Sequence, residues 1–317
     1  MRILITGGMG FIGGNLAVAL SNVSDQITLA SREALEPPQW LPTAKMIQID
    51  WKDTQSISQM CNGIDVVVHT AGMNAQDCQN NPEDALIFNG HATEKLVKAA
   101  TNNGVKRFIY LSTAHVYSNP LAGNFTEDSA TSNNHPYAIS HRIGEEAVLE
   151  MQNLNIIEAV VIRLSNVYGK PTHVEANCWD LLINEICRKI FINHEIVLRT
   201  NGSQQRDFIT MSDTIGVIRR LVHELNFRGI PAILNLGSYS SKSVLEITNL
   251  ISKRAELMLG FEVPVQRVVK PETPSIQTLR YGSNFKQIFE KEIRNDYEAE
   301  IDSLLEYCQN EFNLGLK

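Results

Sequence analysis

The sequence predicts an α/β fold in which a doubly wound parallel sheet forms the larger part of the molecule. Short apolar segments alternate with stretches of helical pattern through the first half of the 317-residue chain, which is typical of parallel strands joined by helices. Continuous apolar runs such as Val66–Val68 and Ala159–Ile162 indicate strands that are covered on both faces. The predicted strands are Arg2–Thr6, Gln26–Ser31, Lys45–Asp50, Asp65–Thr70, Arg107–Ser112 and Glu158–Leu164.

After Gly169 the alternation weakens, which indicates a second, smaller α/β region. The pattern there predicts a helix over Trp179–Ile190, extended segments at Ile196–Arg199 and Asp207–Met211, a strand at Ala232–Leu236 and a helix over Val244–Leu259. We expect a larger domain of residues 1–169 that is completed by about 210–260, and a smaller C-terminal region made of residues 170–209 and 261–317. A cleft between the two is the natural place for a ligand.

Composition excludes several classes of protein. The net charge of −7 disfavours a nucleic-acid binder, and no segment reaches the about 18 to 20 continuous apolar residues that a membrane helix needs. The apolar run Ile3–Ile5 is too short for a signal peptide, so we expect a cytoplasmic protein. Five scattered cysteines without a C-x-x-C spacing argue against both a disulfide framework and a metal site.

A glycine-rich turn follows the first predicted strand directly. Its spacing is read either as Gly7-x-x-Gly10-x-x-Gly13 or as Gly8-x-Gly10-x-x-Gly13, and a helix begins behind it. Glycines in this place allow a tight turn and a close approach of the backbone to a pyrophosphate, while the helix N-terminus offers free N–H groups. The turn therefore predicts a dinucleotide site at Gly7, Gly10, Phe11, Ile12 and Gly13.

The end of the second strand bears on which dinucleotide is bound. An acidic residue about 20 residues past the turn usually holds the adenosine ribose, but this chain has Ser31 and Arg32 there. A guanidinium binds a ribose 2′-phosphate, so NADP(H) is favoured. If the strand ends two residues later, Glu33 becomes the ribose ligand and NAD(H) is favoured instead.

Taken together, several short motifs resemble one known family. They are Thr6–Gly13, Asp50, His69–Gly72, Asn89, Leu111–Tyr117, Pro136–Tyr137, Arg163–Gly169 and Gln205–Ile209. With them the chain resembles the extended short-chain dehydrogenases/reductases, in the branch of NAD-dependent epimerases and dehydratases that act on nucleotide sugars. The resemblance implies further cofactor contacts from Asp50, Trp51, Thr70, Ala71, Gly72, Asn89 and Val167.

The resemblance also implies that Tyr137 is the catalytic acid/base and that Thr113 hydrogen-bonds the reacting oxygen. Pro136 is well placed to open a helix, which puts Tyr137 in the first turn. Thr113 follows a buried strand and so lies at the edge of the sheet where doubly wound folds bind ligands.

His141 is the main departure from the family pattern, which continues Tyr-x-x-x-Lys. The lysine is expected to hold the nicotinamide ribose and to lower the tyrosine pKa by its charge. A histidine four residues on lies on the same helix face and can still donate to a ribose hydroxyl, but its charge is not fixed. Because oxidation needs a tyrosinate and reduction a protonated tyrosine, the change favours reduction, or a slow or inactive enzyme.

On the substrate side, Arg206 matches the family's diphosphate-binding arginine, with Asp207 or Asp213 either orienting it or packing structurally. Arg280 is a weaker candidate of the same kind, and Asn166 matches a residue near the nicotinamide and the substrate phosphate. Dehydratases of the family resemble Thr-Asp-Glu after the fifth strand, whereas this chain has Thr113, Ala114 and His115, of which His115 is a possible polar sugar contact.

These observations favour NADPH-dependent reduction of a nucleotide-linked 4-keto sugar. The alternatives are an NAD-dependent C4 epimerase, for which an acid after the second strand and a fixed lysine would be expected, and a catalytically weak NAD(P)-binding protein. By resemblance we expect a homodimer formed through the helices near Ala85–Ala100 and Tyr137–Met151.

Overall fold

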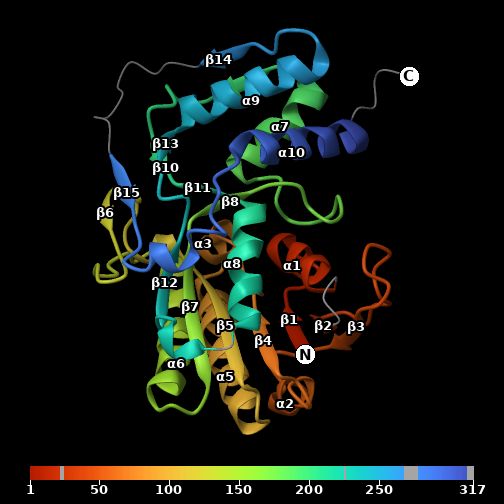
Figure 1. Ribbon diagram of the computed structural model, residues 1–317, viewed down its shortest axis with the longest axis vertical. Helices are drawn as coiled ribbons and strands as arrows, with labels where there is room; N and C mark the ends of the chain where they lie inside the picture. Colours follow the sequence, from red (N-terminus) through yellow and green to blue (C-terminus); the bar gives the residue numbers. More distant parts are fainter. Residues whose placement is uncertain (22–24, 225, 268–277, 313–317) are drawn as a thin grey trace.

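A seven-stranded, fully parallel sheet is the centre of the protein in the computed structural model, which describes residues 1–21, 25–224, 226–267 and 278–312 (Figure 1). The strand order is β12-β7-β5-β4-β1-β2-β3. The strands are β1 (Arg2–Thr6), β2 (Gln26–Ser31), β3 (Lys45–Gln48), β4 (Val66–His69), β5 (Arg107–Thr113), β7 (Glu158–Leu164) and β12 (Ile233–Leu236). The order reverses between β1 and β4, and such a reversal places a ligand crevice at the carboxyl ends of the strands. The predicted doubly wound fold is confirmed.

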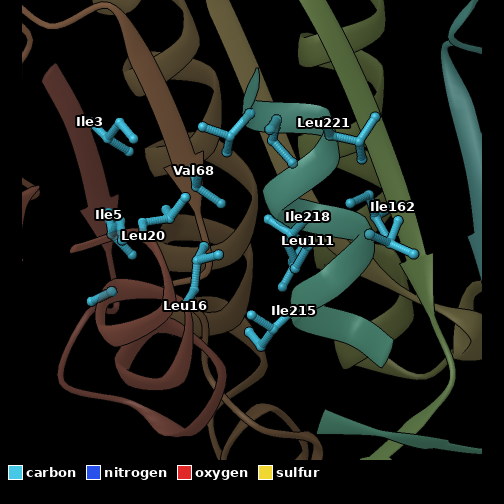
Figure 2. Packing of buried hydrophobic residues seen from close by; sticks show 14 of the residues in the cluster. Ile3, Ile5, Leu16, Leu20, Val68, Leu111, Ile162, Ile215, Ile218 and Leu221 are labelled. Atoms are coloured by element: carbon cyan, nitrogen blue, oxygen red, sulfur yellow. The ribbon is translucent and has the colours of Figure 1, made fainter. Parts of the chain in front are cut away.

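Side chains alternate between the two faces of the sheet, and each face is covered by helices. On one face Ile3, Ile5 and Val68 point toward α1 (Phe11–Ser21) and α8 (Met211–His223), as Figure 2 shows. The opposite face carries apolar side chains such as Leu4, Val67 and Phe108. Three helices cover it, namely α2 (Thr54–Met60), α5 (Ala92–Asn102) and α6 (Pro136–Asn153). This double cover explains the continuous apolar runs of the strands.

The connection from β4 to α5 is more irregular than the pattern suggested. It contains the short helices α3 (Ala75–Asn80) and α4 (Pro82–Ala85) and then a π-helical turn, η1 (Leu86–His91), which runs directly into α5. Isolated π-turns are frequent at functional sites. This one carries Asn89, a residue of the expected cofactor site.

The smaller region has an apolar core of its own. Helices α7 (Leu182–Asn193), α9 (Val244–Leu259) and α10 (Tyr297–Phe312) pack together in it and lie beyond the carboxyl ends of the sheet strands (Figure 1). The strand β9 (Ile196–Leu198) pairs with β14 (Val265–Arg267) beside them. The division expected from the sequence assigns α9 to the larger domain. In the structure, the buried side chains of α9 pack with those of α7 and α10 in the smaller region. We therefore propose that the smaller region takes up the chain again before α9.

Three small strand pairs connect the two regions near the carboxyl edge of the sheet. The strand β8 (Asn166–Tyr168) pairs with β11 (Phe208–Thr210), and β10 (Gln205–Arg206) pairs with β13 (Lys242–Ser243). The third pair is formed by β6 (Gly123–Phe125) and β15 (Leu279–Tyr281).

Within the described ranges, no helix combines the length and the apolar character that crossing a membrane requires.

Candidate active site

The glycine-rich turn is as tight as its sequence predicts. Gly7 has a φ of 69°, and a Cβ on it would lie 2.8 Å from the Ala71 backbone nitrogen. A Cβ on Gly13 would overlap the Gly7 carbonyl oxygen and lie 2.8 Å from Thr70 Oγ1. The Gly10 N–H closes the turn by donating to the Gly7 carbonyl at 2.9 Å. Side chains are therefore excluded where the strand, the turn and the helix meet.

The first turn of α1 presents free donors at this place. The Gly14 N–H donates to the Gly10 carbonyl, but the amides of Phe11, Ile12 and Gly13 donate to no group of the described chain. No acidic side chain lies in this turn. Phe11 itself is buried in the core, so its backbone is what can contact a ligand. These features fit the pyrophosphate of a dinucleotide.

An aromatic surface lies where the adenosine end of a dinucleotide would be expected. The Trp51 and Phe88 rings meet edge to face at 5.7 Å, and the guanidinium carbon of Arg32 lies 5.9 Å from the Phe88 centroid. The Ser31 hydroxyl accepts the Glu33 N–H at 3.1 Å. Asp50 accepts the Lys52 N–H at 2.9 Å. No pattern in the sequence pointed to Phe88, which reaches this surface from the π-turn.

Asn89 fastens the loop after β4 to α6. Its side-chain oxygen accepts the Met73 N–H at 2.7 Å, and its amide donates to Ser140 Oγ at 3.2 Å. Thr70 and Ala71 are tied to β1, since Thr70 Oγ1 donates to the Thr6 carbonyl and the Ala71 N–H donates to Thr6 Oγ1. The loop Thr70–Met73 is thus fixed between the glycine turn and α6.

Thr113 and Tyr137 come together at the carboxyl end of β5. Tyr137 lies in the first turn of α6, where Pro136 occupies an N-terminal position and the Tyr137 N–H donates to Nδ1 of the capping His135 at 3.2 Å. Desolvation raises the pKa of Tyr137 above its usual value, and a polar contact with the Thr113 hydroxyl acts in the opposite direction. The pair is arranged as expected for a proton-transferring tyrosine and a helping hydroxyl.

His141 lies one helical turn beyond Tyr137 and is buried, with 6% of its surface exposed. The two rings meet edge to face at 4.6 Å, and Nδ1 of His141 lies 2.9 Å from the Tyr110 hydroxyl. Burial lowers the pKa of His141 to about 4. The position where the family pattern places a lysine charge is therefore neutral at physiological pH.

A second buried histidine, His69, is hydrogen-bonded through both ring nitrogens. The Thr93 hydroxyl donates its proton to the Asn89 carbonyl at 2.7 Å, so it accepts from Nε2 of His69 at 2.8 Å. On the other side Nδ1 accepts from the Thr6 hydroxyl at 2.6 Å. Burial and, to a smaller extent, the neighbouring His141 lower the pKa of His69 to about 3. His69 is a neutral structural link between β4 and α5.

The expected substrate residues lie on the strands that connect the two regions. Arg206 is half-buried, forms no ion pair or hydrogen bond through its side chain within the described residues, and has its pKa lowered by desolvation. Desolvation also lowers the pKa of His115, and the charge of Arg206 adds to that effect. The two side chains therefore lie near each other. Such an uncompensated, partly desolvated guanidinium suits an anionic ligand.

The remaining candidates are placed less directly. Asn166 donates to the Asp207 carbonyl at 2.9 Å, while the Val167 side chain is buried in the core. Arg280 is exposed on β15, which is tied to β10 because the Leu279 N–H donates to Gln205 Oε1 at 3.0 Å.

Neither acidic residue suggested to orient Arg206 does so. The Asp207 carboxylate accepts from Ser238, and the Asp213 carboxylate accepts the N–H groups of Arg294 and Asn295. Both carboxylates therefore pack structurally.

An internal ion pair fixes α6 on the sheet. Glu145 of α6 and Arg163 of β7 are both nearly excluded from solvent and lie 2.7 Å apart. Ser112 donates to Glu145 at 2.5 Å, and Arg163 donates to the Tyr117 hydroxyl at 3.0 Å. No local sequence signal identifies this pair, since its members are distant in the chain.

Comparison with known proteins places this geometry in a family. The model of the NAD dependent epimerase/dehydratase family matches residues 3–237. The chain belongs to this family. A dTDP-D-glucose 4,6-dehydratase of Mus musculus is 29% identical over 259 residues, which cover 78% of this chain and 70% of that one. The low-salt glycan biosynthesis protein Agl12 of Haloferax volcanii is 26% identical, covering 79% of this chain and 81% of its own.

Solved structures of family members have the same fold. TunA, an NAD dependent NDP-hexosamine 5,6-dehydratase involved in tunicamycin biosynthesis, superposes with a TM-score of 0.78 at 25% identity and covers 98% of this chain and 99% of its own. The UDP-glucose 4-epimerase of Thermotoga maritima superposes with a TM-score of 0.80 at 19% identity, and the match covers 98% of this chain and 99% of its own. MoeE5, solved with UDP-glucose and NAD, superposes with a TM-score of 0.77 at 23% identity, and the match covers 98% of this chain and 99% of its own.

The expected family is thus confirmed, and it is a family of NAD-dependent enzymes. The related proteins are epimerases and dehydratases of nucleotide sugars, so they support the epimerase alternative better than the expected 4-keto reduction. Several of the solved relatives contain NAD, which gives no support to the expected preference for NADP(H).

The glycine turn yields a direct test of dinucleotide binding. In Gly13→Ala the new methyl group overlaps the Gly7 carbonyl, so we expect the dissociation constants of the cofactor-free protein for NAD and NADP to rise at least tenfold in calorimetric titration. Gly229→Ala is the matched control, because a Cβ there meets no atom within 4 Å. Unchanged binding in a folded Gly13→Ala protein would place the dinucleotide elsewhere.

Proposed function

We propose that the protein is a nucleotide-sugar C4 epimerase that oxidises and then re-reduces the same carbon. The observation that carries the proposal is the set of residues at the end of β5. Thr113 and Tyr137 stand together there, as oxidation and reduction at C4 require, while Ala114 offers no ionisable group for the elimination of water. Dehydratases of the family need an acid and a base in this place, so epimerisation is the better match among the family's reactions.

A nicotinamide dinucleotide bound along the glycine turn supplies the hydride acceptor and the hydride donor. Tyr137 takes the proton from the C4 hydroxyl during oxidation and returns it during reduction, and the Thr113 hydroxyl holds the reacting oxygen. Inversion requires that the 4-keto ring turns before it is reduced. Arg206 keeps the diphosphate bound during this step, and Asn166 and Arg280 are proposed to assist it.

His115 is proposed to contact the sugar from the side of Arg206. Its lowered pKa keeps the imidazole neutral at physiological pH, so the ring can both donate and accept a hydrogen bond. A sugar hydroxyl presents the matching pair of groups. His115 would therefore contribute to the choice of sugar without taking part in proton transfer.

The choice of dinucleotide is proposed to depend on Arg32. Some solved relatives contain NAD, whereas here β2 ends at Ser31 and is followed first by the exposed Arg32, which can bind a 2′-phosphate, and only then by Glu33. We propose that the site accepts both NAD(H) and NADP(H). An epimerase regenerates its cofactor in each cycle, so either dinucleotide meets the chemical requirement.

Net reduction of a 4-keto sugar is the second candidate, and the neutral His141 favours it. Without a charge beside it, Tyr137 keeps its proton to higher pH, which suits a proton donor more than a base.

We also propose that the protein forms the expected homodimer. Helices α5 and α6 pack side by side on one face of the sheet, which would allow both to take part in an interface (Figure 1).

Turnover assays distinguish these candidates. We expect the purified protein to interconvert C4 epimers among UDP- and dTDP-hexoses without added cofactor, and acid denaturation to release the dinucleotide it carries. Tyr137→Phe should lower the rate at least 100-fold because the proton carrier is lost, whereas Tyr307→Phe, whose hydroxyl lies outside the site, should not. Conversion only of 4-keto sugars with consumption of NADPH would establish the reductase, and binding without turnover the inactive protein.

The role of His141 is tested by placing the positive charge of a lysine at position 141, where the family pattern has one. In His141→Lys an ammonium beside Tyr137 lowers the pKa of the phenol, so the rise of kcat/KM with pH that reflects tyrosinate formation should move to lower pH by about one unit or more. His194→Lys, at a left-handed helix C-cap, serves as the control and should follow the wild-type profile. An unchanged profile in His141→Lys would remove His141 from the mechanism.

A further inference from the structure

Tyr110 is a buried tyrosine of β5 that faces α6 beneath the active site. Only 1% of its surface is exposed. Its ring lies between two histidines, with centroids 5.5 Å from His69 and 6.0 Å from His141. Among the described residues, Nδ1 of His141, at 2.9 Å, has hydrogen-bond geometry with the Tyr110 hydroxyl. The Thr93 hydroxyl is a looser polar contact, which acts against the rise of the Tyr110 pKa. Neither the family pattern nor the proposed function assigns this residue a task.

The direction of this hydrogen bond follows from the surrounding protons. Burial raises the pKa of Tyr110 well above its usual value, so the phenol keeps its single proton and must donate it. The nearby Thr93 hydroxyl gives its own proton to the Asn89 carbonyl and accepts from His69. Tyr110 therefore donates to Nδ1 of His141. A neutral imidazole that accepts at Nδ1 carries its proton on Nε2.

The other ring nitrogen of His141, Nε2, is not fully buried. It forms no hydrogen bond within the described part of the chain. The ring lies against Tyr137 on one side. On another, its Cε1 atom would be 3.8 Å from a Cβ on Gly72, in the loop after β4. An N–H donor is thus presented between the catalytic tyrosine and the loop that borders the dinucleotide site.

We infer that Tyr110 is a positioning residue that holds His141 as the neutral Nε2–H tautomer, so that His141 donates one hydrogen bond to the dinucleotide ribose without placing a charge beside Tyr137. The two tasks of the family's lysine are thereby separated. The ribose contact is kept, and the electrostatic effect on the tyrosine is given up. The inference rests on dinucleotide binding at the glycine turn and not on the direction of the reaction.

The tautomer is measured directly in the wild-type protein. Long-range ¹H–¹⁵N spectra of the histidine-labelled protein, with His141 assigned from the His141→Gln variant, should show a protonated Nε2 and an unprotonated Nδ1 at pH 7. A protonated Nδ1 overturns the inference. This measurement needs neither turnover nor a substitution at Tyr110, so its outcome is independent of whether the protein is an epimerase.

Removing the Tyr110 hydroxyl tests whether it controls the tautomer of His141 and the binding of the dinucleotide. In Tyr110→Phe we expect the Nε2–H form to lose its dominance and the dissociation constant for the dinucleotide to rise about three- to tenfold. Tyr168→Phe is the matched control, because its hydroxyl has no hydrogen-bond partner among the described residues and its side chain is buried in the core of the smaller region, so it should change neither quantity. If Tyr110→Phe leaves both the tautomer and the dissociation constant as in the wild type, Tyr110 has no positioning role.

A pair of amide variants locates the donor. His141→Gln places an N–H near the position of Nε2 and should keep the dissociation constant within about threefold, whereas His141→Asn places it near Nδ1 and should weaken binding at least as much as Tyr110→Phe. Equal binding by the two amide variants would contradict a donor at Nε2.

Discussion

The buried ion pair between Glu145 and Arg163 sets the position of α6, and the active site depends on that position. Two charges without access to water are costly unless their remaining hydrogen bonds are satisfied, and here Ser112 and Tyr117 satisfy them. Glu145 lies one turn beyond His141 and two turns beyond Tyr137 on the same helix. The register between the helix and β5 that brings Tyr137 to Thr113 is thus fixed by groups from β5, β7 and α6 together.

The charges around the site are distributed unevenly. Near Tyr137, His141 and His69 are neutral because burial lowers their pKa values, and Glu145 is neutralised by Arg163. On the substrate side, Arg206 has no ion-pair partner among the described residues and lies near His115. This arrangement suits the proposed anionic nucleotide sugar on the side of Arg206, while it leaves the proton affinity of the tyrosine high. An epimerase built in this way needs the positive nicotinamide of the bound oxidised cofactor to assist ionisation of Tyr137.

Local patterns in the sequence were sufficient for much of this structure. Strands such as Glu158–Leu164 and the helix Val244–Leu259 have the predicted ends, because apolar runs and the Ser243 capping box are short-range signals. The glycine turn and the helix start at Pro136 were predictable for the same reason. The packing of α9 was not, because an amphipathic pattern says that a face is buried but not against which partner.

The contacts that decide the chemistry are long-range ones. Tyr110 and His141 are 31 residues apart, and Arg163 lies 18 residues from Glu145, so no spacing rule connects them. Phe88, which packs against Trp51, lies in the π-turn, which was not predicted from the sequence. The absence of a lysine at position 141 was visible in the sequence, but the neutral state of its replacement depends on burial that only the fold reveals.

The most direct test of the account follows the hydrogen at C4 of the substrate. The nucleotide hexose that the enzyme converts is prepared with deuterium at C4 and incubated with the purified protein in ordinary water without added dinucleotide. We expect the epimerised product to keep the deuterium on C4, because the same hydride is removed and returned while Tyr137 exchanges only the hydroxyl proton. Loss of deuterium from C4 of the product, or conversion that stops unless reduced dinucleotide is supplied, would contradict the account.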